Sequence, residues 1–209
     1  MSYADNTPVQ PNPIHVAFVI DDGPVEGKSD AYIKLFREKN VVATFSFVAS
    51  VLEKDPGDGR AILAAGHEVA NHSFDHRHPA ELGEEQLEQE VWDAQQIMKR
   101  ILGTGPRIYW PPYVETTEAL LQVVRKHGLG LIPFRNFIGT RDWDRSVGGE
   151  QIYKLATTNI TDGTLINFHE WREETLQQMP AIIDELRRQG CVFLRASEMA
   201  DYLSGSPAR

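Results

Sequence analysis

Short apolar runs recur along this chain, and each is long enough for one buried strand. The first is His15–Ile20, and Val41–Val48 follows it. Short continuous apolar runs between polar or turn-forming residues are typical of strands that are covered on both faces. Further strands are predicted at Leu129–Pro133, Leu165–Phe168 and Val192–Leu194.

Between these runs, apolar residues recur at the spacing of an α-helix. The clearest helix begins with the acidic Glu84 and Glu85 and stops at Gly103, residues that suit the two ends of a helix. Alternation of strands and helices predicts an α/β fold with a mainly parallel sheet or barrel, whose chemistry sits at the carboxyl ends of the strands. The apolar positions of this helix are Leu87, Val91, Ala94, Met98 and Ile101, and further helices are predicted at Ser29–Lys39, Thr116–His127 and from Pro180 to Gly190.

Composition narrows the class of protein. The chain has 209 residues, which suits one domain with a sizeable core. Its 21 basic and 30 acidic residues give a net charge of −9, so we expect no nucleic-acid partner, because binding a phosphate backbone needs a basic surface. No apolar run is long enough for a transmembrane segment. Cys191 is the single cysteine, which excludes an internal disulfide and a cysteine-based metal site.

We expect a polar, loose N-terminal arm over residues 1–13, one catalytic domain over residues 14–203 and a short tail over residues 204–209. The first residues have neither a basic start nor an apolar stretch, so they do not form a signal peptide. Two locations stay open: the protein stays inside the cell, or a leader has been removed from it. Protein partners cannot be predicted from the sequence.

Two adjacent carboxylates, Asp21 and Asp22, directly follow the first predicted strand and precede Gly23 and Pro24. Such residues also favour an ordinary turn. Adjacent carboxylates repel each other unless a cation neutralises one of them. One of the pair could therefore bind a metal ion while the other acts as a base.

A histidine pair follows in the segment from Gly66 to His76. His72 and His76 are four residues apart, so on one helical turn both rings would face the same side and could chelate one ion. Such pairs often arise by chance. Together with an upstream carboxylate, however, they make a plausible set of two nitrogen ligands and one oxygen ligand with open positions. We interpret His67 as a structural residue near the core.

Further polar and aromatic clusters follow later strands. Pro111 and Pro112 fix an extended loop between Trp110 and Tyr113, which is either a structural turn or a stiff wall beside a site. Another cluster contains Asp142 and Trp143, and a third contains Asn167 and His169. A histidine paired with a buried carboxylate such as Asp142 could be a positioned general acid.

The order of these motifs resembles the polysaccharide deacetylase family, the NodB-homology domain of carbohydrate esterase family 4. The resemblance runs from about Ile14 to Leu203 and is most specific in the stretch HSFDH, which ends at His76. It implies a distorted, incomplete (β/α) barrel. It also implies an enzyme that removes N-acetyl groups from N-acetylglucosamine units of chitin or peptidoglycan, or O-acetyl groups from xylan. The expected cofactor is a divalent metal ion, zinc first, with cobalt, nickel or manganese as alternatives.

The resemblance also implies roles for single residues. Asp21 matches the catalytic base, and Asp22, His72 and His76 match the metal ligands. Ser73 matches the residue that steadies this loop.

The remaining roles concern the acid, the oxyanion and the pocket. Tyr113 matches the residue whose backbone N–H helps to bind the oxyanion. Asp142 matches the carboxylate that orients His169, the expected general acid, and Trp143 matches a wall of the pocket. Pro112, Trp110 and Asn167 are expected to contact the substrate.

Three positions depart from the family pattern. Trp110 stands where the family has an Arg that holds the base, Gly139 where it has an Asp, and Asn167 where it has a Leu that lines the acetyl pocket. We interpret Trp110 as a ring that stacks on a sugar or narrows the pocket. Asp21 would then depend on the metal alone to stay ionised.

The leading hypothesis is a metal-dependent N-deacetylase of amino sugars. An O-acetyl esterase on the same scaffold is a close alternative. An iron oxygenase with two histidines and a carboxylate fits the acidic pair less well, because two adjacent carboxylates suit hydrolysis better. A carbohydrate-binding relative with weak catalysis is the alternative from a different class, and the three departures motivate it.

Overall fold

The computed structural model describes residues 12–131 and 135–205. Within these ranges six strands form one sheet, and every pairing between the strands is parallel. The α/β class and the mainly parallel sheet expected from the sequence are therefore confirmed. The strands are β1 (Ile14–Gly23), β2 (Thr44–Phe47), β3 (Glu68–Asn71), β4 (Asn136–Gly139), β5 (Thr164–His169) and β6 (Cys191–Leu194). The expected arm and tail lie mostly at residues 1–11 and 206–209, outside the described residues.

Strand β1 lies at the centre of the sheet and carries the acidic pair at its carboxyl end. Residues 16–21 of β1 pair with β5 along one edge. The other edge is shared, because β6 pairs with residues 14–17 and β2 pairs from residue 19 onward. The carboxyl ends of β1, β2, β3 and β5 therefore meet at one end of the sheet, where parallel α/β folds place their sites.

Two isolated parallel bridges continue the sheet beyond β3. Asn71 pairs with Tyr109, and Ile108 pairs with Gly130. The strand expected at Leu129–Pro133 is thus reduced to one bridge at Gly130, and its residues 132 and 133 lie outside the described part of the chain. No pairing among the described residues joins the two ends of the sheet into a closed ring.

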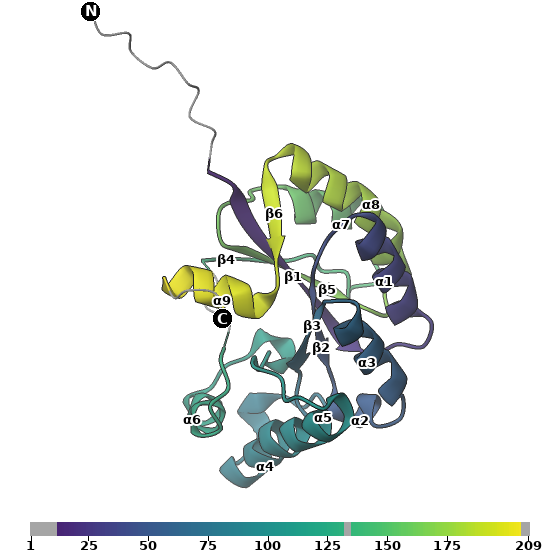
Figure 1. The fold of residues 1–209 in the computed structure, drawn as a ribbon. Coiled ribbons are helices and arrows are strands. Elements are labelled where there is room, and N and C mark those ends of the chain that lie inside the picture. The colour runs from purple at the N-terminus through teal and green to yellow at the C-terminus, as the bar shows by residue number, and fades with distance from the viewer. Residues whose placement is uncertain (1–11, 132–134, 206–209) are drawn as a thin grey trace, which may run out of the picture.

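Helices surround the strands. Figure 1 shows α1, α3, α7 and α8 on one side of the strands, at the right of the view, with α4 and α5 below them and α9 on the other side. The α-helices are α1 (Lys28–Glu38), α2 (Ala49–Leu52), α3 (Pro56–Ala64), α4 (Glu84–Glu88), α5 (Ala94–Leu102), α6 (Glu118–Lys126), α7 (Gly149–Thr157), α8 (Glu173–Arg188) and α9 (Ala196–Ser204). Single turns of other helix types are η1 (Pro79–Glu81), η2 (Gln89–Asp93, a π-helical turn) and η3 (Pro112–Val114).

Buried aromatic rings fix β1 against its neighbours. Phe18 of β1 is fully buried and packs edge-on against Phe168 of β5, with ring centres 5.3 Å apart. Its ring also packs against Phe193 of β6 at 5.1 Å. Close packing of this kind leaves few alternative arrangements. It therefore holds the carboxyl end of β1 in one place relative to β5.

The last long helix begins earlier than the sequence predicts. We expected a start at Pro180, but α8 begins at Glu173 and contains Pro180 in its interior. Proline removes a backbone donor and usually breaks a helix. Here Met179, Ile182 and Ile183 on either side of this position are fully buried. Burial of this apolar face outweighs the lost hydrogen bond.

Several elements of the structure have no counterpart among the predicted ones, namely α2, α3, α7, α9, β3 and β4. The strands β3 and β4 have four residues each, too few for a clear alternating pattern. The helix expected from Glu84 to Gly103 is confirmed as the continuous segment α4–η2–α5, with the π-helical turn in its middle. Gly103 caps it with a φ of 77°, in the left-handed region that glycine adopts freely.

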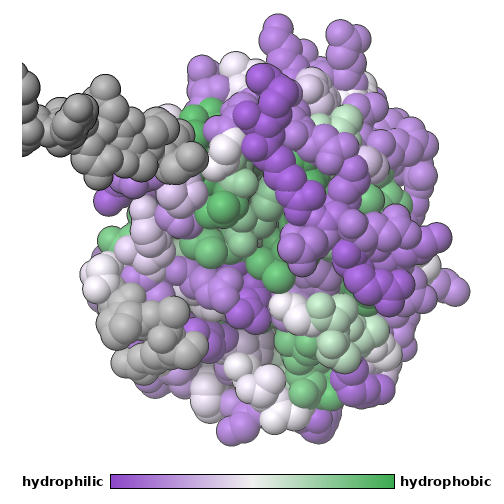
Figure 2. All heavy atoms as spheres, turned by 45° about the horizontal axis from the view of Figure 1, so that its top comes forward, coloured by the Kyte–Doolittle hydropathy of each residue, from purple (hydrophilic) through white to green (hydrophobic). Residues whose placement is uncertain are grey.

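One face of the molecule is mainly polar. Figure 2 shows a face that is mostly hydrophilic, with hydrophobic side chains gathered near its centre. Among the described helices, none combines the length and the apolar character that crossing a bilayer requires.

Candidate functional site

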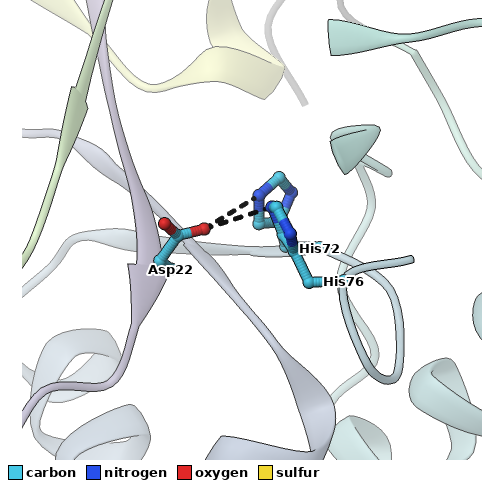
Figure 3. Close-up of side chains that lie close together, drawn as sticks. All are labelled: Asp22, His72 and His76. Atoms are coloured by element: carbon cyan, nitrogen blue, oxygen red, sulfur yellow. Dashed lines mark ion pairs between the residues drawn. The ribbon is translucent and has the colours of Figure 1, made fainter. Parts of the chain in front are cut away.

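Asp22, His72 and His76 lie together at the carboxyl ends of β1 and β3. The Oδ1 atom of Asp22 is 3.5 Å from Nε2 of His72 and 3.3 Å from Nε2 of His76. Figure 3 shows both imidazole rings directed toward this carboxylate, which comes from β1. All three ligand atoms lie within 4.8 Å of one another. The predicted ligand set is therefore brought together in space.

This set fits a divalent cation. The Oδ1 atom of Asp22 is buried and accepts no hydrogen bond from the described residues. A buried carboxylate oxygen without a donor is costly, and a cation held between it and two histidine nitrogens would remove that cost. Two nitrogen ligands and one carboxylate oxygen, with positions left for water and substrate, are typical of catalytic zinc sites.

The two histidines come from a loop, which corrects one expectation. The segment from His72 to His76 follows β3 without forming a helical turn. Ser73 and His76 have φ values of 69° and 58°, so the chain turns back on itself. The Ser73 Oγ accepts a hydrogen bond from the His76 backbone N–H at 2.8 Å, which closes this turn. The four-residue spacing thus brings the rings together through a tight loop.

Glu90 holds this loop in place through hydrogen bonds to its backbone. Its carboxylate is buried in η2 and accepts hydrogen bonds from the backbone N–H groups of Phe74 and Asp75, at 3.1 and 3.0 Å. The π-helical turn breaks the regular helical register at this residue. The loop with both histidines is therefore fastened to the segment α4–η2–α5.

Further hydrogen bonds orient the ligands. The Nδ1 atom of His72 lies 2.7 Å from the carbonyl oxygen of Trp110, an arrangement that places the proton on Nδ1 and leaves Nε2 free for a metal. The indole N–H of Trp171 donates to Oδ2 of Asp22 at 3.0 Å. Burial alone would raise the pKa of Asp22, but the facing His72 and the charge of His169 lower it well below its usual range.

Asp21 points to the same place and is held by neutral donors. Its Oδ2 accepts hydrogen bonds from the indole N–H of Trp110 at 3.0 Å and from the amide of Asn167 at 2.7 Å. Its Oδ1 accepts a hydrogen bond from the hydroxyl of Ser46. The Oδ2 atom also lies 4.0 Å from Nε2 of His72. The two carboxylates of the acidic pair thus have different surroundings.

The structure contradicts the expected stacking of Trp110 on a sugar. Its side chain is only 1% exposed and packs beside Phe137, so it cannot stack on a sugar. Its indole N–H instead donates to Oδ2 of Asp21, so a protein donor contacts this carboxylate directly. Asn167 is 6% exposed; its amide bonds Asp21, and the residue also lines the cavity described below.

The half-buried His169 and the buried Asp142 form a second pair. The Nδ1 atom of His169 lies 2.7 Å from Oδ1 of Asp142, while Oδ2 of Asp142 accepts hydrogen bonds from the His169 backbone N–H and from the hydroxyl of Thr175. Burial opposes a charged imidazole, but this hydrogen bond and the nearby carboxylates, Asp21 among them, raise the pKa of His169 to about 9. The ring is therefore held protonated at neutral pH in this arrangement.

One cavity of about 530 Å³ joins these groups, a usual size for a small-molecule site. Tyr113 and Trp143 are 52% and 58% exposed, so both offer aromatic surface at its mouth. Tyr113 has a φ of 58° and stacks on His78, with ring centres 3.5 Å apart. The predicted residues that line the cavity are Asp21, Asp22, His72, His76, Tyr113, Trp143, Asn167 and His169.

Asp142, Trp110 and Pro112 lie behind the cavity wall and are buried. Asp142 contacts the cavity-lining His169, and Trp110 contacts the cavity-lining Asp21. The ring of Pro112 belongs to the turn η3, so the expected substrate contact from Pro112 is not supported.

Several residues of the site were missed from the sequence. Ser46 and Trp171 bond the two carboxylates of the acidic pair, and Phe137 forms part of the cavity wall. Ser46 is the polar residue between two phenylalanines of a predicted strand, a pattern that could have marked it. Phe137 had no such signal, because the strand that carries it was not predicted.

Comparison with known proteins agrees with this geometry. Residues 9–132, more than half of the chain, match the family model described as polysaccharide deacetylase. The chain is 25% identical over 190 residues to a peptidoglycan-N-acetylglucosamine deacetylase of Bacillus cereus, covering 90% of this chain and 88% of that protein. It is 27% identical over 192 residues to a chitooligosaccharide deacetylase of Azorhizobium caulinodans, covering 85% of this chain and 89% of that protein.

A solved structure shares the fold. It is a family 4 acetyl xylan esterase from Clostridium thermocellum in complex with a cobalt ion. The TM-score is 0.82 at 27% identity, and the match covers 92% of this chain and 93% of the other.

Proposed function

This chain belongs to the polysaccharide deacetylase family, and on that premise we propose that it is a metal-dependent hydrolase that removes N-acetyl groups from amino-sugar polymers or oligomers. The observation that supports the proposal most strongly is the set of residues that meet at one cavity. It holds a ligand set for a divalent ion, a separate carboxylate beside that set, and a protonated histidine. These are the parts that hydrolysis of an amide requires.

Asp22, His72 and His76 would hold the ion, which would supply Lewis-acid polarisation of the acetyl carbonyl and a lower pKa for water. Zinc is the first choice because the ligands are two imidazole nitrogens and one carboxylate oxygen. Asp21 takes the proton from the attacking water, since it lies beside the ligand set without belonging to it. The backbone N–H of Tyr113 donates to the oxygen that becomes negative.

His169 completes the reaction as the general acid. The C–N bond breaks readily only when the leaving nitrogen receives a proton. The hydrogen bond to Asp142 keeps the imidazole protonated and directs its Nε2 away from that carboxylate. This group favours an amide substrate over an ester, because an alcohol leaves with less need of a proton.

Carbohydrate recognition is assigned to the mouth of the cavity. Trp143 and Tyr113 line the cavity, and their side chains are exposed. Exposed aromatic faces present apolar surface to the C–H groups of a pyranose ring. The relatives that act on peptidoglycan N-acetylglucosamine and chitooligosaccharides support an amino sugar as the substrate.

The test is release of acetate from a panel of acetylated glycans. The enzyme is stripped with a chelator, and zinc, cobalt, nickel or manganese is added back. We expect release from chitooligosaccharides or peptidoglycan only after metal is returned. Because a solved relative is an acetyl xylan esterase, acetylated xylan belongs to the panel. Faster release from xylan would favour O-acetyl esterase activity, and sugar binding without any acetate would favour a non-catalytic carbohydrate-binding protein.

A further inference from the structure

We propose that three neutral hydrogen-bond donors, Ser46, Trp110 and Asn167, act together as positioning residues for Asp21, in place of the charged residue expected there. This proposal rests on the proposed function, in which Asp21 is the base. Trp110 and Asn167 both donate to Oδ2, at 3.0 and 2.7 Å, and Ser46 donates to Oδ1. We call these three residues the neutral cradle.

The neutral cradle is rigid because it is assembled from separate parts of the fold. Ser46 lies on β2, and Asn167 lies on β5, on the opposite edge of β1. Trp110 follows the bridge beside β3, where its backbone N–H donates to the carbonyl of Asn71 at 2.8 Å. All three side chains are buried, at 0%, 1% and 6% exposure, so water does not compete strongly for their donors.

The neutral cradle also gives a common explanation for two of the departures from the family pattern. An Arg at position 110 would place a positive charge beside the ligand set. Trp110 and Asn167 instead supply two N–H groups to the same oxygen and add no formal charge. A carboxylate that accepts several hydrogen bonds from buried donors is fixed in direction. Asp21 can therefore face the cavity in one orientation without a cation competing with the metal.

The backbone of Trp110 has a separate task, which makes the test sharp. Its carbonyl oxygen lies 2.7 Å from Nδ1 of His72, a predicted metal ligand. Trp110→Phe removes the indole N–H and keeps both the carbonyl group and an apolar ring beside Phe137. Asn167→Leu removes the amide and restores the residue expected from the family pattern. Neither change removes a metal ligand.

We expect each variant to lower kcat about tenfold or more, since each removes a hydrogen bond to a charged group. The zinc content per chain should stay within about twofold of wild type in both variants, because no metal ligand is changed. KM should stay within about twofold of wild type in Trp110→Phe, whose side chain is buried outside the cavity lining, whereas Asn167→Leu also alters the cavity wall. Trp92→Phe is the matched control, because Trp92 stacks on His127 away from the cavity. Variants with kcat within about twofold of wild type at full metal content would overturn the proposal.

The decisive step repeats both substitutions in an Asp21→Asn background. If the neutral cradle acts through Asp21, Trp110→Phe and Asn167→Leu cause little further loss of the residual activity. An equal loss in both backgrounds would assign these residues another role. Crystal structures of the zinc-loaded Trp110→Phe and Asn167→Leu proteins supply a readout without activity, and we expect the Asp21 carboxylate to leave its wild-type orientation in them.

The two proposals fail differently. A wild-type protein that binds zinc but releases no acetate from any glycan would contradict the proposed function. The neutral cradle would then be tested by the orientation of Asp21 in the variant crystals, and an unchanged carboxylate would refute it.

Discussion

His169 owes part of its raised pKa to Asp142, and this dependence can be measured. Asp142→Asn removes the negative charge 2.7 Å from Nδ1 and should lower the pKa of His169 from about 9 toward its ordinary value. A general acid is active only while protonated, so activity should be lost at a lower pH than in wild type. The measurement is kcat/KM from about pH 6 to about pH 10. An alkaline limb that stays in place would remove Asp142 from this role, and Asp144→Asn on the surface is the control.

The adjacent carboxylates Asp21 and Asp22 should separate in function although they are neighbours in sequence. Asp22→Asn should lose zinc together with activity, because Asp22 supplies the oxygen of the ligand set. Asp21→Asn should keep zinc and lose kcat by about 10²- to 10⁴-fold, the usual effect of removing a general base. Zinc content by elemental analysis beside acetate release checks both. If the two variants lose zinc to the same extent, the division of roles is wrong.

At the scale of single residues, the sequence predicts well which residue types form the site and predicts poorly where their side chains point. Asp22, His72 and His76 were chosen from type and spacing, and they meet in the structure. Trp110 was assigned to the substrate, yet its side chain is buried. Periodicity tells which way a side chain points only inside a helix or strand. Trp110 lies outside both, so its direction depends on contacts with β1 and β3 that the local sequence does not contain.

At the scale of elements, the loop with the two histidines depends on Glu90 in η2. Glu90→Ala leaves the backbone N–H groups of Phe74 and Asp75 without their buried acceptor. The loop should loosen, and zinc affinity should fall about tenfold or more, as for other changes behind metal ligands. Competition with a chromophoric chelator measures this. Glu90→Gln keeps an oxygen acceptor and should recover part of the affinity, whereas wild-type affinity in Glu90→Ala would contradict the role.

The same elements show where local patterns fail. The spacing of His72 and His76 predicted a helical turn, but a left-handed φ at Ser73 and at His76 makes a loop. Two different backbones can bring such a pair together, and spacing does not distinguish them. Pro180 predicted a helix start, but burial of Met179 and Ile182 carries α8 through it. In both cases tertiary contacts decided what the local signal left open.

At the scale of the whole molecule, one buried acid and one buried base make the stability of the fold change with pH in opposite directions. Burial, with the charge of Asp58 nearby, raises the pKa of Glu170 from 4.5 to about 7, so the folded state keeps a proton that the unfolded chain loses. Stability from this group therefore falls as pH rises from about 4.5 to about 7. Burial lowers the pKa of His67 from 6.5 to about 4, and stability from His67 falls as pH drops through that window.

Glu170→Gln removes the acid and keeps its shape beside the Ser29 hydroxyl. At pH values above about 7 the variant should be more stable than wild type, by at most about 3 kcal/mol. Between about pH 4.5 and 6.5 the stability of the variant should rise with pH more steeply than that of wild type. The reason is that the Glu170 contribution, which falls as pH rises, is absent. Urea unfolding in the presence of a chelator measures both. A variant with the wild-type pH dependence would show that Glu170 ionises normally in the fold.

The two edges of β1 have a consequence for how the chain reaches its native state. β2 emerges soon after β1 during synthesis and covers only the carboxyl half of one edge. β5 and β6, which cover the other edge and the remaining half, come from the last quarter of the chain. Pairing over such long separations is slow, and a strand with bare edges can join the wrong partner. The strand with the acidic pair is therefore synthesised first and its partners β5 and β6 last, so a ribosome-bound intermediate exposes unpaired edges of β1.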